Sequence, residues 1–428
     1  MNQRAPITQA EKQIIVEKKA KGMSIRAISI ELKCSFETGR KWWRYERDQR
    51  KPRPRGRPKR GPLSTYAPAV VEKAVELKKA HPHWGPDMVK LAMVKQLQLD
   101  PARLPSAARL SVLFKQRCPE AVQPRQRRLQ APADPKVREV HQRWQMDAKE
   151  GLSLGNERAN VQEIRDCYSG LMIVSQAFLT TLPTGWRHLK RAEHQQALRK
   201  AFSQWGLPLE LQTDHDGEFV NITDPTFPSP FTLWLVGLGV THVLSRPHRP
   251  TDQPQIERSH RSQGDFVWKD QVFEHLDPFQ QALDQQCQSY NQTYPSHAGH
   301  CNGTPPLAAF PYAVSTGRPY HLDLEWTLFD LQRVYAFLAQ SVWTRKVASN
   351  GAIHIGGDYY LLGSHWIAHL VSIRFLPDNC SFRFESEEGE EIAILPAQGL
   401  DKEHLIGVIP AHPPLPIGYQ FAFPLIGV

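Results

Sequence analysis

The six cysteines of this 428-residue chain are few and scattered, and no two of them have the CxxC spacing. Such a pattern predicts reduced thiols and argues against a disulfide framework or a zinc site. No run approaches the ~18 apolar residues that a membrane span requires, and the N-terminal string MNQRAPITQAEK lacks the apolar core of a signal peptide. We therefore expect a soluble, cytoplasmic protein with no membrane partner. The cysteines are Cys34, Cys118, Cys167, Cys287, Cys301 and Cys380.

Acidic residues are scarce in the first third of the chain. Residues 1–140 carry 32 Lys and Arg against 13 Asp and Glu, a formal charge of +19, so the rest carries −9 of the total of +10. This asymmetry predicts an N-terminal arm that binds a polyanion, and nucleic acid is the polyanion we expect. The hydrophobic content of 40% can build folded cores, and at roughly 100–150 residues per domain the length predicts several domains.

Residues 1–50 predict a domain of three short helices, with Thr8, Ser24 and Ser35 as their N-caps. The string KGMSIRAISIELKCSFETGRKWWRYER resembles the helix-turn-helix of many bacterial transposases and regulators, although Gly39 stands where that family usually has a β-branched residue. In such a motif the third helix enters the major groove. The resemblance implies DNA contacts by Arg40, Lys41 and Arg44.

Residues 51–63 begin KPRPRGRPKRGP, where alternating proline, glycine and cations predict an extended basic linker. The Arg55-Gly56-Arg57-Pro58 segment resembles an AT-hook, which inserts arginines into a narrow A·T minor groove. Nonspecific tracking of phosphates by Arg55 and Arg57 is the alternative interpretation.

Residues 64–120 predict a second helical domain, with helices near Ala67–Ala80, Pro86–Gln96 and Ser106–Gln116. This stretch resembles the second helix-turn-helix of insertion-sequence transposases. The resemblance implies DNA contacts by Ser106, Arg109 and Lys115. A second basic linker follows over residues 121–136.

Strands and helices alternate over residues 137–320, which predicts an α/β core with a mixed sheet and helices packed on it. The expected strands are WQMDA, two strands around a turn at Ser169-Gly170, LELQTD and THVLSR; the expected helices cover 184–205, a segment from about Gln253, and Pro278–Tyr290. Residues 321–400 contain short β-rich runs separated by glycine turns, which predict a small antiparallel barrel. Residues 401–428 form a Pro-rich tail.

Three acidic residues of this core have settings that indicate chemistry. Asp147 ends the strand WQMDA, Asp214 ends LELQTD, and Glu257 lies just inside a helix in RPTDQPQIERSHRS. Carboxylates at adjacent strand ends, with a third on a helix over the sheet, can converge on one point. Mg²⁺ takes such oxygen ligands together with substrate phosphates. Two ions roughly 3.5–4 Å apart can drive an in-line displacement at phosphorus.

Several ordered motifs resemble the DDE transposases of the retroviral-integrase superfamily, whose catalytic core is RNase H-like. They are TDHDGEFVN, RPTDQPQIERSHRS and YNQTYPSHAGHCNGTPPLAAFP, followed by a β-rich region similar to the small barrel after the Mu-type core. The resemblance implies that Asp147, Asp214 and Glu257 are the catalytic residues and hold two Mg²⁺ ions, for which Mn²⁺ can substitute. Asp216 is an alternative second ligand, and Asp252 an alternative third.

The resemblance further implies cleavage at transposon ends and transfer of the freed 3′-hydroxyl into target DNA. The expected partners are both DNAs and further copies of the chain on paired ends, with a AAA+ ATPase as a candidate by analogy with Mu-type systems, at a bacterial nucleoid. His260 and Arg261 share the helix face of Glu257, where they would meet phosphate. Two alternatives stay open: a catalytically inactive, domesticated DNA-binding protein, and a simple nuclease.

Overall fold

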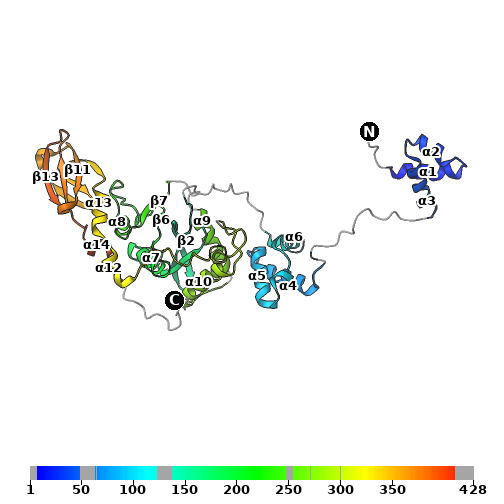
Figure 1. Ribbon diagram of the computed structural model, residues 1–428, viewed down its shortest axis with the longest axis horizontal. Coiled ribbons are helices and arrows are strands. Elements are labelled where there is room, and N and C mark those ends of the chain that lie inside the picture. Colours follow the sequence, from blue (N-terminus) through cyan, green and yellow to red (C-terminus); the bar gives the residue numbers. More distant parts are fainter. Residues whose placement is uncertain are drawn as a thin grey trace, which may run out of the picture. The chain divides into compact units, whose positions relative to one another are not determined.

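The computed structural model describes residues 7–48, 63, 65–122, 137–246, 254–269, 271–298 and 300–409. The chain divides into two compact units, Met1–Thr65 and Tyr66–Val428 (Figure 1). The basic linker expected at 51–63 lies almost wholly outside the described residues, as do most of the linker expected at 121–136 and of the tail expected at 401–428. The candidate contacts Arg55 and Arg57 and the alternative ligand Asp252 therefore lie outside them too.

The described part of the first unit contains three helices, α1 (Gln9–Ala20), α2 (Ile25–Glu31) and α3 (Phe36–Arg47). Each begins after its predicted cap, because the Thr8, Ser24 and Ser35 hydroxyls each accept a hydrogen bond from a backbone N–H in the first turn. The three predicted helices are confirmed.

Gly39 lies where α3 crosses α2. It is buried, and a Cβ atom at this position would lie 2.3 Å from Ser29 Oγ. A β-branched residue would therefore push the two helices apart. The departure from the usual motif thus has a packing reason, which is the close approach of α2 and α3.

The second unit begins with another three helices, α4 (Pro68–Ala80), α5 (Pro86–Leu97) and α6 (Ala107–Arg117), whose predicted bounds are confirmed to within a residue or two. They pack against one another, with Leu77, Val89 and Leu110 among the buried residues. Two short 3₁₀ turns, Pro101–Arg103 and Pro119–Ala121, flank α6.

A five-stranded mixed sheet follows, built from β1 (Arg143–Leu154), β2 (Glu157–Asp166), β3 (Met172–Leu179), β6 (Glu210–Thr213) and β7 (Thr241–Leu244). The strand order is β3-β2-β1-β6-β7. The first three strands pair antiparallel, whereas β6 runs parallel to both β1 and β7. The predicted mixed sheet is confirmed, and it places β1 and β6 side by side.

Helices cover both faces of this sheet (Figure 1). α7 (Arg191–Trp205) contributes Leu198 and Phe202 to the larger core. α10 (Leu276–Gln292) covers the other face, where Phe279 and Leu283 belong to a second core. The remaining helices of this part are α8 (Pro230–Gly237), α9 (Pro254–Gln263), a π-helical turn (Gly264–Trp268) that continues α9, and α11 (Pro306–Ala309).

Three details differ from the sequence-based expectations. The helix expected from residue 184 begins at Arg191, because Pro183 lies in a turn between two short strands, β4 (Thr181–Leu182) and β5 (Gly185–Trp186). The strand expected at WQMDA continues to Leu154 and forms a hairpin with β2. Helix α8 was not predicted, because its sequence PFTLWLVG is apolar on every side and shows no helical periodicity.

The C-terminal region is an antiparallel β structure reached through α12 (Glu325–Leu328) and α13 (Leu331–Leu338). Its described strands form two sheets, one of four strands in the order β13-β12-β11-β8 and one hairpin of β9 and β10. The antiparallel strands are confirmed, whereas the expected barrel stays a prediction. The bounds are β8 Val342–Lys346, β9 Ala352–Ile355, β10 Asp358–Leu361, β11 Leu370–Leu376, β12 Ser381–Glu385 and β13 Glu391–Pro396, followed by α14 Lys402–Ile406; short 3₁₀ turns cover Leu322–Leu324, Ser364–Trp366 and Pro377–Asn379.

This C-terminal region shares its core with the central sheet. Trp343 on β8 packs against Phe227, which precedes α8, with ring centroids 5.1 Å apart. Trp343 Nε1 also donates a hydrogen bond to Thr226 O at 3.0 Å. None of the helices among the described residues is long and apolar enough to cross a membrane.

Candidate active site

Asp147 and Asp214 come together because their strands are parallel neighbours. Gln145 on β1 pairs with Gln212 on β6, so the aspartates two residues further on lie at the same edge of the sheet. Both line one cavity of about 220 Å³. Its other lining residues are Ala148, Glu150, His188, Leu189, His194, Asp216 and Phe219.

Asp214 and Asp216 form consecutive turns at the end of β6. Asp214 Oδ1 accepts a hydrogen bond from the backbone N–H of Asp216 at 3.0 Å, and Asp216 Oδ1 accepts one from Glu218 N–H at 2.9 Å. Partial loss of solvent around the carboxyl, and then the negative charges of Asp147 and Asp216, raise the pKa of Asp214. Because both aspartates line the cavity, Asp216 stays an alternative second ligand.

A histidine clamp holds the Asp147 carboxylate. His260 on α9 places Nε2 3.0 Å from Asp147 Oδ2 and Nδ1 3.1 Å from Glu163 Oε1. Glu163 on β2 is directly opposite Asp147 in the sheet and is almost fully buried. Burial alone lowers the pKa of His260, but the charge of Glu163 and the contacts with both carboxylates outweigh burial and raise it to about 10. The ring is therefore an imidazolium between two carboxylates.

Glu257, the expected third ligand, lies exposed in the first turn of α9. Among the residues that the structure describes, no group of three or more His, Cys, Asp or Glu side chains is arranged to hold a metal ion. The structure therefore brings Asp147 and Asp214 together at one cavity but does not join Glu257 to them in such a group. On the same helix it gives His260 two carboxylate partners, while Arg261 is exposed.

Sequence reasoning missed His194 and Gln162, which lie beside the aspartates. His194 on α7 contacts Gln162 on β2, with Nδ1 and Oε1 2.6 Å apart. The Gln162 amide in turn donates to the backbone carbonyl of Asp147 at 2.8 Å. Burial lowers the pKa of His194 to about 4. Like Glu163, these residues lie inside regular elements where no local motif marks them.

The expected DNA contacts on the helical domains lie at the protein surface. Arg40, Lys41 and Arg44 are exposed on α3. Lys115 and Arg109 are exposed on α6, and Arg109 bonds Tyr66 Oη at 3.1 Å. Ser106 has a structural function as the N-cap of α6. DNA binding by these residues stays a prediction.

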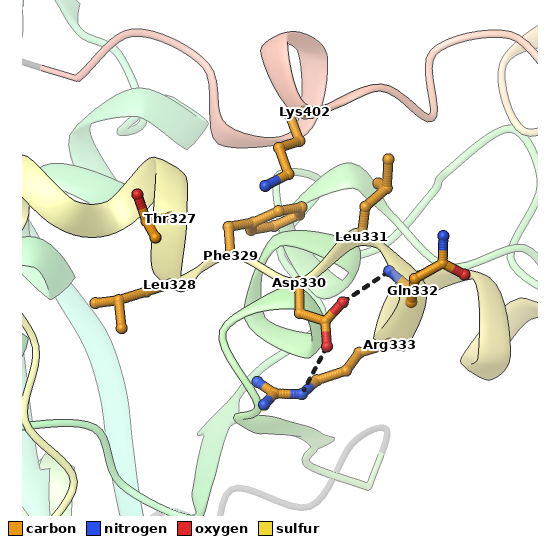
Figure 2. Close-up of a pocket in the computed structure, with 8 residues that line it drawn as sticks. All are labelled: Thr327, Leu328, Phe329, Asp330, Leu331, Gln332, Arg333 and Lys402. Atoms are coloured by element: carbon orange, nitrogen blue, oxygen red, sulfur yellow. Dashed lines mark hydrogen bonds and ion pairs between the residues drawn. The ribbon is translucent and has the colours of Figure 1, made fainter.

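A larger open hollow of about 550 Å³ lies elsewhere, along the segment that connects α12 to α13 (Figure 2). Asp330 caps α13 by accepting from Gln332 N–H at 2.9 Å, and it also pairs with Arg333 at 3.5 Å. Lys402 contributes a second cation. None of the acids predicted for catalysis lines this hollow, so it is separate from the candidate site.

The donors around the cavity fit a divalent cation in part. Asp147 and Asp214 offer the carboxylate oxygens that Mg²⁺ takes, and Mg²⁺ is commonly bound by one or two carboxylates together with substrate phosphates. The raised pKa of Asp214 has the Asp147 charge among its causes, and a bound cation would relieve that repulsion. The described residues thus supply two suitable carboxylates.

No family model matches the chain. Three solved structures of retroviral proteins are similar to it. The catalytic core domain of BIV integrase is 18% identical over 40% of this chain and 95% of its own, with a TM-score of 0.28. The HTLV-2 integrase catalytic core domain in complex with magnesium is 16% identical over 40% of this chain and 95% of its own, with a TM-score of 0.28.

A chain of the simian T-cell lymphotropic virus intasome, in complex with PP2A regulatory subunit B56 gamma, is 15% identical. The match covers 55% of this chain and 74% of that one, with a TM-score of 0.30. Identities and scores are low in all three cases. The strand order and the side-chain contacts described above, rather than these likenesses, therefore define the site.

Proposed function

We propose that the protein is a DDE-type DNA transposase whose central sheet is an RNase H-like catalytic core. One observation carries the proposal: Asp147 and Asp214, on neighbouring parallel strands, line one cavity. The sequence singles out both because each lies at or next to the end of a segment, WQMDA or LELQTD, that predicts a strand. An acidic cavity at a strand edge suits phosphodiester chemistry, because that chemistry needs carboxylates to hold divalent cations.

Asp147 and Asp214 would hold the cations, with Glu257 as the proposed third ligand. When bound, Mg²⁺ or Mn²⁺ supplies Lewis-acid activation of the attacking oxygen and stabilises the leaving one. The chain's own contribution is to fix the donors. His260 holds one oxygen of Asp147, and Glu163 contacts the other nitrogen of the His260 ring. The turn at Asp216 fixes one oxygen of Asp214.

Two successive exchanges at phosphorus make up the proposed reaction. Hydrolysis of a phosphodiester at the end of the element breaks one P–O bond and frees a 3′-hydroxyl. That hydroxyl then attacks a phosphodiester of the target, so the new P–O bond replaces the one that breaks. The exposed cations of α3 and α6 would bind the terminal sequences, chiefly through phosphates. Paired ends would require at least two copies of the chain.

Substitution of each aspartate tests the proposal. We expect Asp147→Asn and Asp214→Asn each to lower Mg²⁺-dependent cleavage at the element's ends on the order of 1,000-fold, since several kcal/mol of transition-state stabilisation are lost. Asp378→Asn, an exposed aspartate of the C-terminal region, is the matched control. If Asp216→Asn abolishes cleavage and Asp214→Asn does not, Asp216 is the second ligand.

Three results would contradict the proposal. Full activity of Asp147→Asn would exclude the carboxylate site. A wild-type protein that binds the ends but cuts nothing would favour the domesticated DNA-binding protein. Cutting without joining of the freed 3′-hydroxyl would identify a nuclease.

A further inference from the structure

His194 is a buried histidine that takes part in the wall of the candidate active site. It lies in the first turns of α7, is only 4% exposed, and lines the cavity that contains Asp147 and Asp214. Its ring packs against Phe219, with centroids 4.6 Å apart. The ring is therefore held by this ring contact and by the Gln162 amide at Nδ1.

The hydrogen bonds of Gln162 determine which nitrogen of His194 carries the proton. The Gln162 amide nitrogen donates to Asp147 O at 2.8 Å, so the amide oxygen is the atom that faces His194. An amide oxygen only accepts, so His194 Nδ1 carries a hydrogen and donates it over 2.6 Å. Burial lowers the pKa of the ring to about 4, although Asp216, Glu193 and Asp147 act in the opposite direction. A neutral ring with a hydrogen on Nδ1 leaves a lone pair on Nε2.

The other groups of the cavity wall limit which partner the lone pair of His194 Nε2 can bind. The other titratable groups are the carboxylates of Asp147, Glu150, Asp214 and Asp216, together with His188, which pairs with Glu150 at 2.7 Å. Carboxylates accept hydrogen bonds, and a bare imidazole nitrogen does too. The wall therefore suits cations and hydroxyl donors. Mg²⁺ prefers oxygen ligands to nitrogen, which leaves a hydroxyl hydrogen as the partner of Nε2.

We propose that His194 is a further catalytic residue, whose Nε2 accepts a hydrogen bond from the attacking hydroxyl and orients its oxygen toward phosphorus. This inference rests on the proposed function, because it assigns a role in that reaction. In each exchange the attacking oxygen forms the new P–O bond, and the leaving oxygen departs with the electron pair of the old one. The proton of the attacking hydroxyl passes on to solvent water, because the imidazole is too weak a base to retain it.

Two substitutions separate the two ring nitrogens. In His194→Asn the amide nitrogen can take the place of Nδ1 and keep the bond to Gln162, while the acceptor at Nε2 is lost. In His194→Gln the longer side chain can bring an amide oxygen to the place of Nε2. His365→Asn is the matched control, since His365 is an exposed histidine of the C-terminal region that does not line this cavity.

The experiment measures single-turnover cleavage of end DNA by the full chain and its Mg²⁺-free affinity for the same DNA. For His194→Asn we expect a loss of about 100-fold in rate, the scale of a mispositioned nucleophile, with unchanged DNA affinity. His194→Gln should recover at least tenfold of that loss, and His365→Asn should cleave like the wild type. Cleavage by His194→Asn at the wild-type rate overturns this inference and leaves the proposed function intact. A wild type that does not cleave overturns both.

A second measurement reads the ring of the wild-type protein directly. Nitrogen-15 NMR of the wild-type protein with labelled histidine, assigned by comparison with His194→Gln, reports which ring nitrogen is protonated. We expect His194 to show a protonated Nδ1 and a bare Nε2 at neutral pH. A hydrogen on Nε2 would overturn the inference, because that nitrogen could then no longer accept.

Discussion

Burial keeps two histidines neutral, His194 on α7 and His242 on β7. His194 and His242 each have a pKa lowered to about 4, with burial as the main cause. Both ring nitrogens of His242 have hydroxyl partners, since Thr213 Oγ1 lies 2.9 Å from Nε2 and Thr232 Oγ1 lies 2.9 Å from Nδ1. A proton on either ring would place a buried charge in the fold, so acid should destabilise the folded state relative to the unfolded chain.

The sign of this effect follows from the two pKa values. The pKa of a histidine is near 6.5 in the unfolded chain, and the pKa values of His194 and His242 are about 4 in the fold. Between pH 4 and 6.5 the unfolded chain therefore binds more protons than the folded one. We expect the free energy of unfolding to fall as pH drops from 6.5 to 4, by up to about 3 kcal/mol for each histidine. Urea unfolding at several pH values measures it. In His242→Asn the free energy of unfolding should depend less steeply on pH than in the wild type. The same slope of unfolding free energy against pH in both proteins would contradict the prediction.

The residues of the site differ in how far the sequence could predict them. Asp214 follows β6 and begins a polar turn, whereas Asp147 lies within β1. Both stand in the segments WQMDA and LELQTD, which predict strands from the sequence alone. His194, Gln162 and Glu163 lie within regular elements, and their contacts join α7, β2 and α9 across 32 to 97 residues of sequence. No local pattern records such a contact, because it depends on which elements the fold brings together.

At the scale of an element, a buried ion pair attaches α9 to the sheet. Glu163 is only 1% exposed, and His260 is the partner that neutralises it. Removing one member of a buried pair leaves an uncompensated charge, which costs about 3–5 kcal/mol. We expect His260→Leu to destabilise the second unit by about that amount, as measured by chemical denaturation.

The double substitution distinguishes a lost charge partner from a lost packing contact. Replacing both residues, as in Glu163→Leu with His260→Leu, removes the buried charge together with its partner, and we expect most of the lost stability to return. Glu163→Leu alone is the remaining variant that a double-mutant cycle requires. If the double variant is as unstable as the sum of the single ones, α9 is held by packing and not by the pair.

The helices of the chain were more predictable than its hairpins, for a physical reason. Thr8, Ser24 and Ser35 cap their helices through bonds to residues three positions away, so each start depends on a few neighbouring residues. The extension of β1 to Leu154 depends instead on its pairing with β2. That pairing is not visible in a segment whose residues are half-buried without a clear alternation.

At the scale of the whole molecule, one hydrophobic core extends from the central sheet into the C-terminal strands. It includes Trp144 and Phe202 of the central region together with Trp343 and Phe382 of the C-terminal one. Arg199 and Glu325 add a fully buried ion pair with Nε and Oε2 2.7 Å apart. The sequence predicts two separate domains here, because the composition changes near residue 320. The packing between the two regions involves residues far apart in the chain, so no local pattern predicts it.

The charge of the chain is also a property of the whole molecule, and it predicts how the first unit binds DNA. Arg40, Lys41 and Arg44 project from one helix, α3, and are exposed. Each phosphate that such a cation neutralises releases a counterion, which makes the affinity fall with salt by a slope of roughly 0.9 per contact. Replacing all three with alanine should therefore weaken binding to every DNA sequence. The slope of log affinity against log salt concentration should become shallower by roughly 2 to 3.

A control with the same change of charge separates a binding helix from general attraction. Lys21, Arg26 and Lys33 are equally exposed in the first unit but lie outside α3. Their triple alanine variant should keep most of the DNA affinity and nearly the whole slope of log affinity against log salt. The reason is that attraction between exposed charges is weak beyond a Debye length of about 8 Å at physiological salt. Fluorescence anisotropy of labelled duplexes from 50 to 300 mM salt measures both variants. Equal losses in the two would mean that α3 has no special position on DNA and that the unit binds by its charge alone.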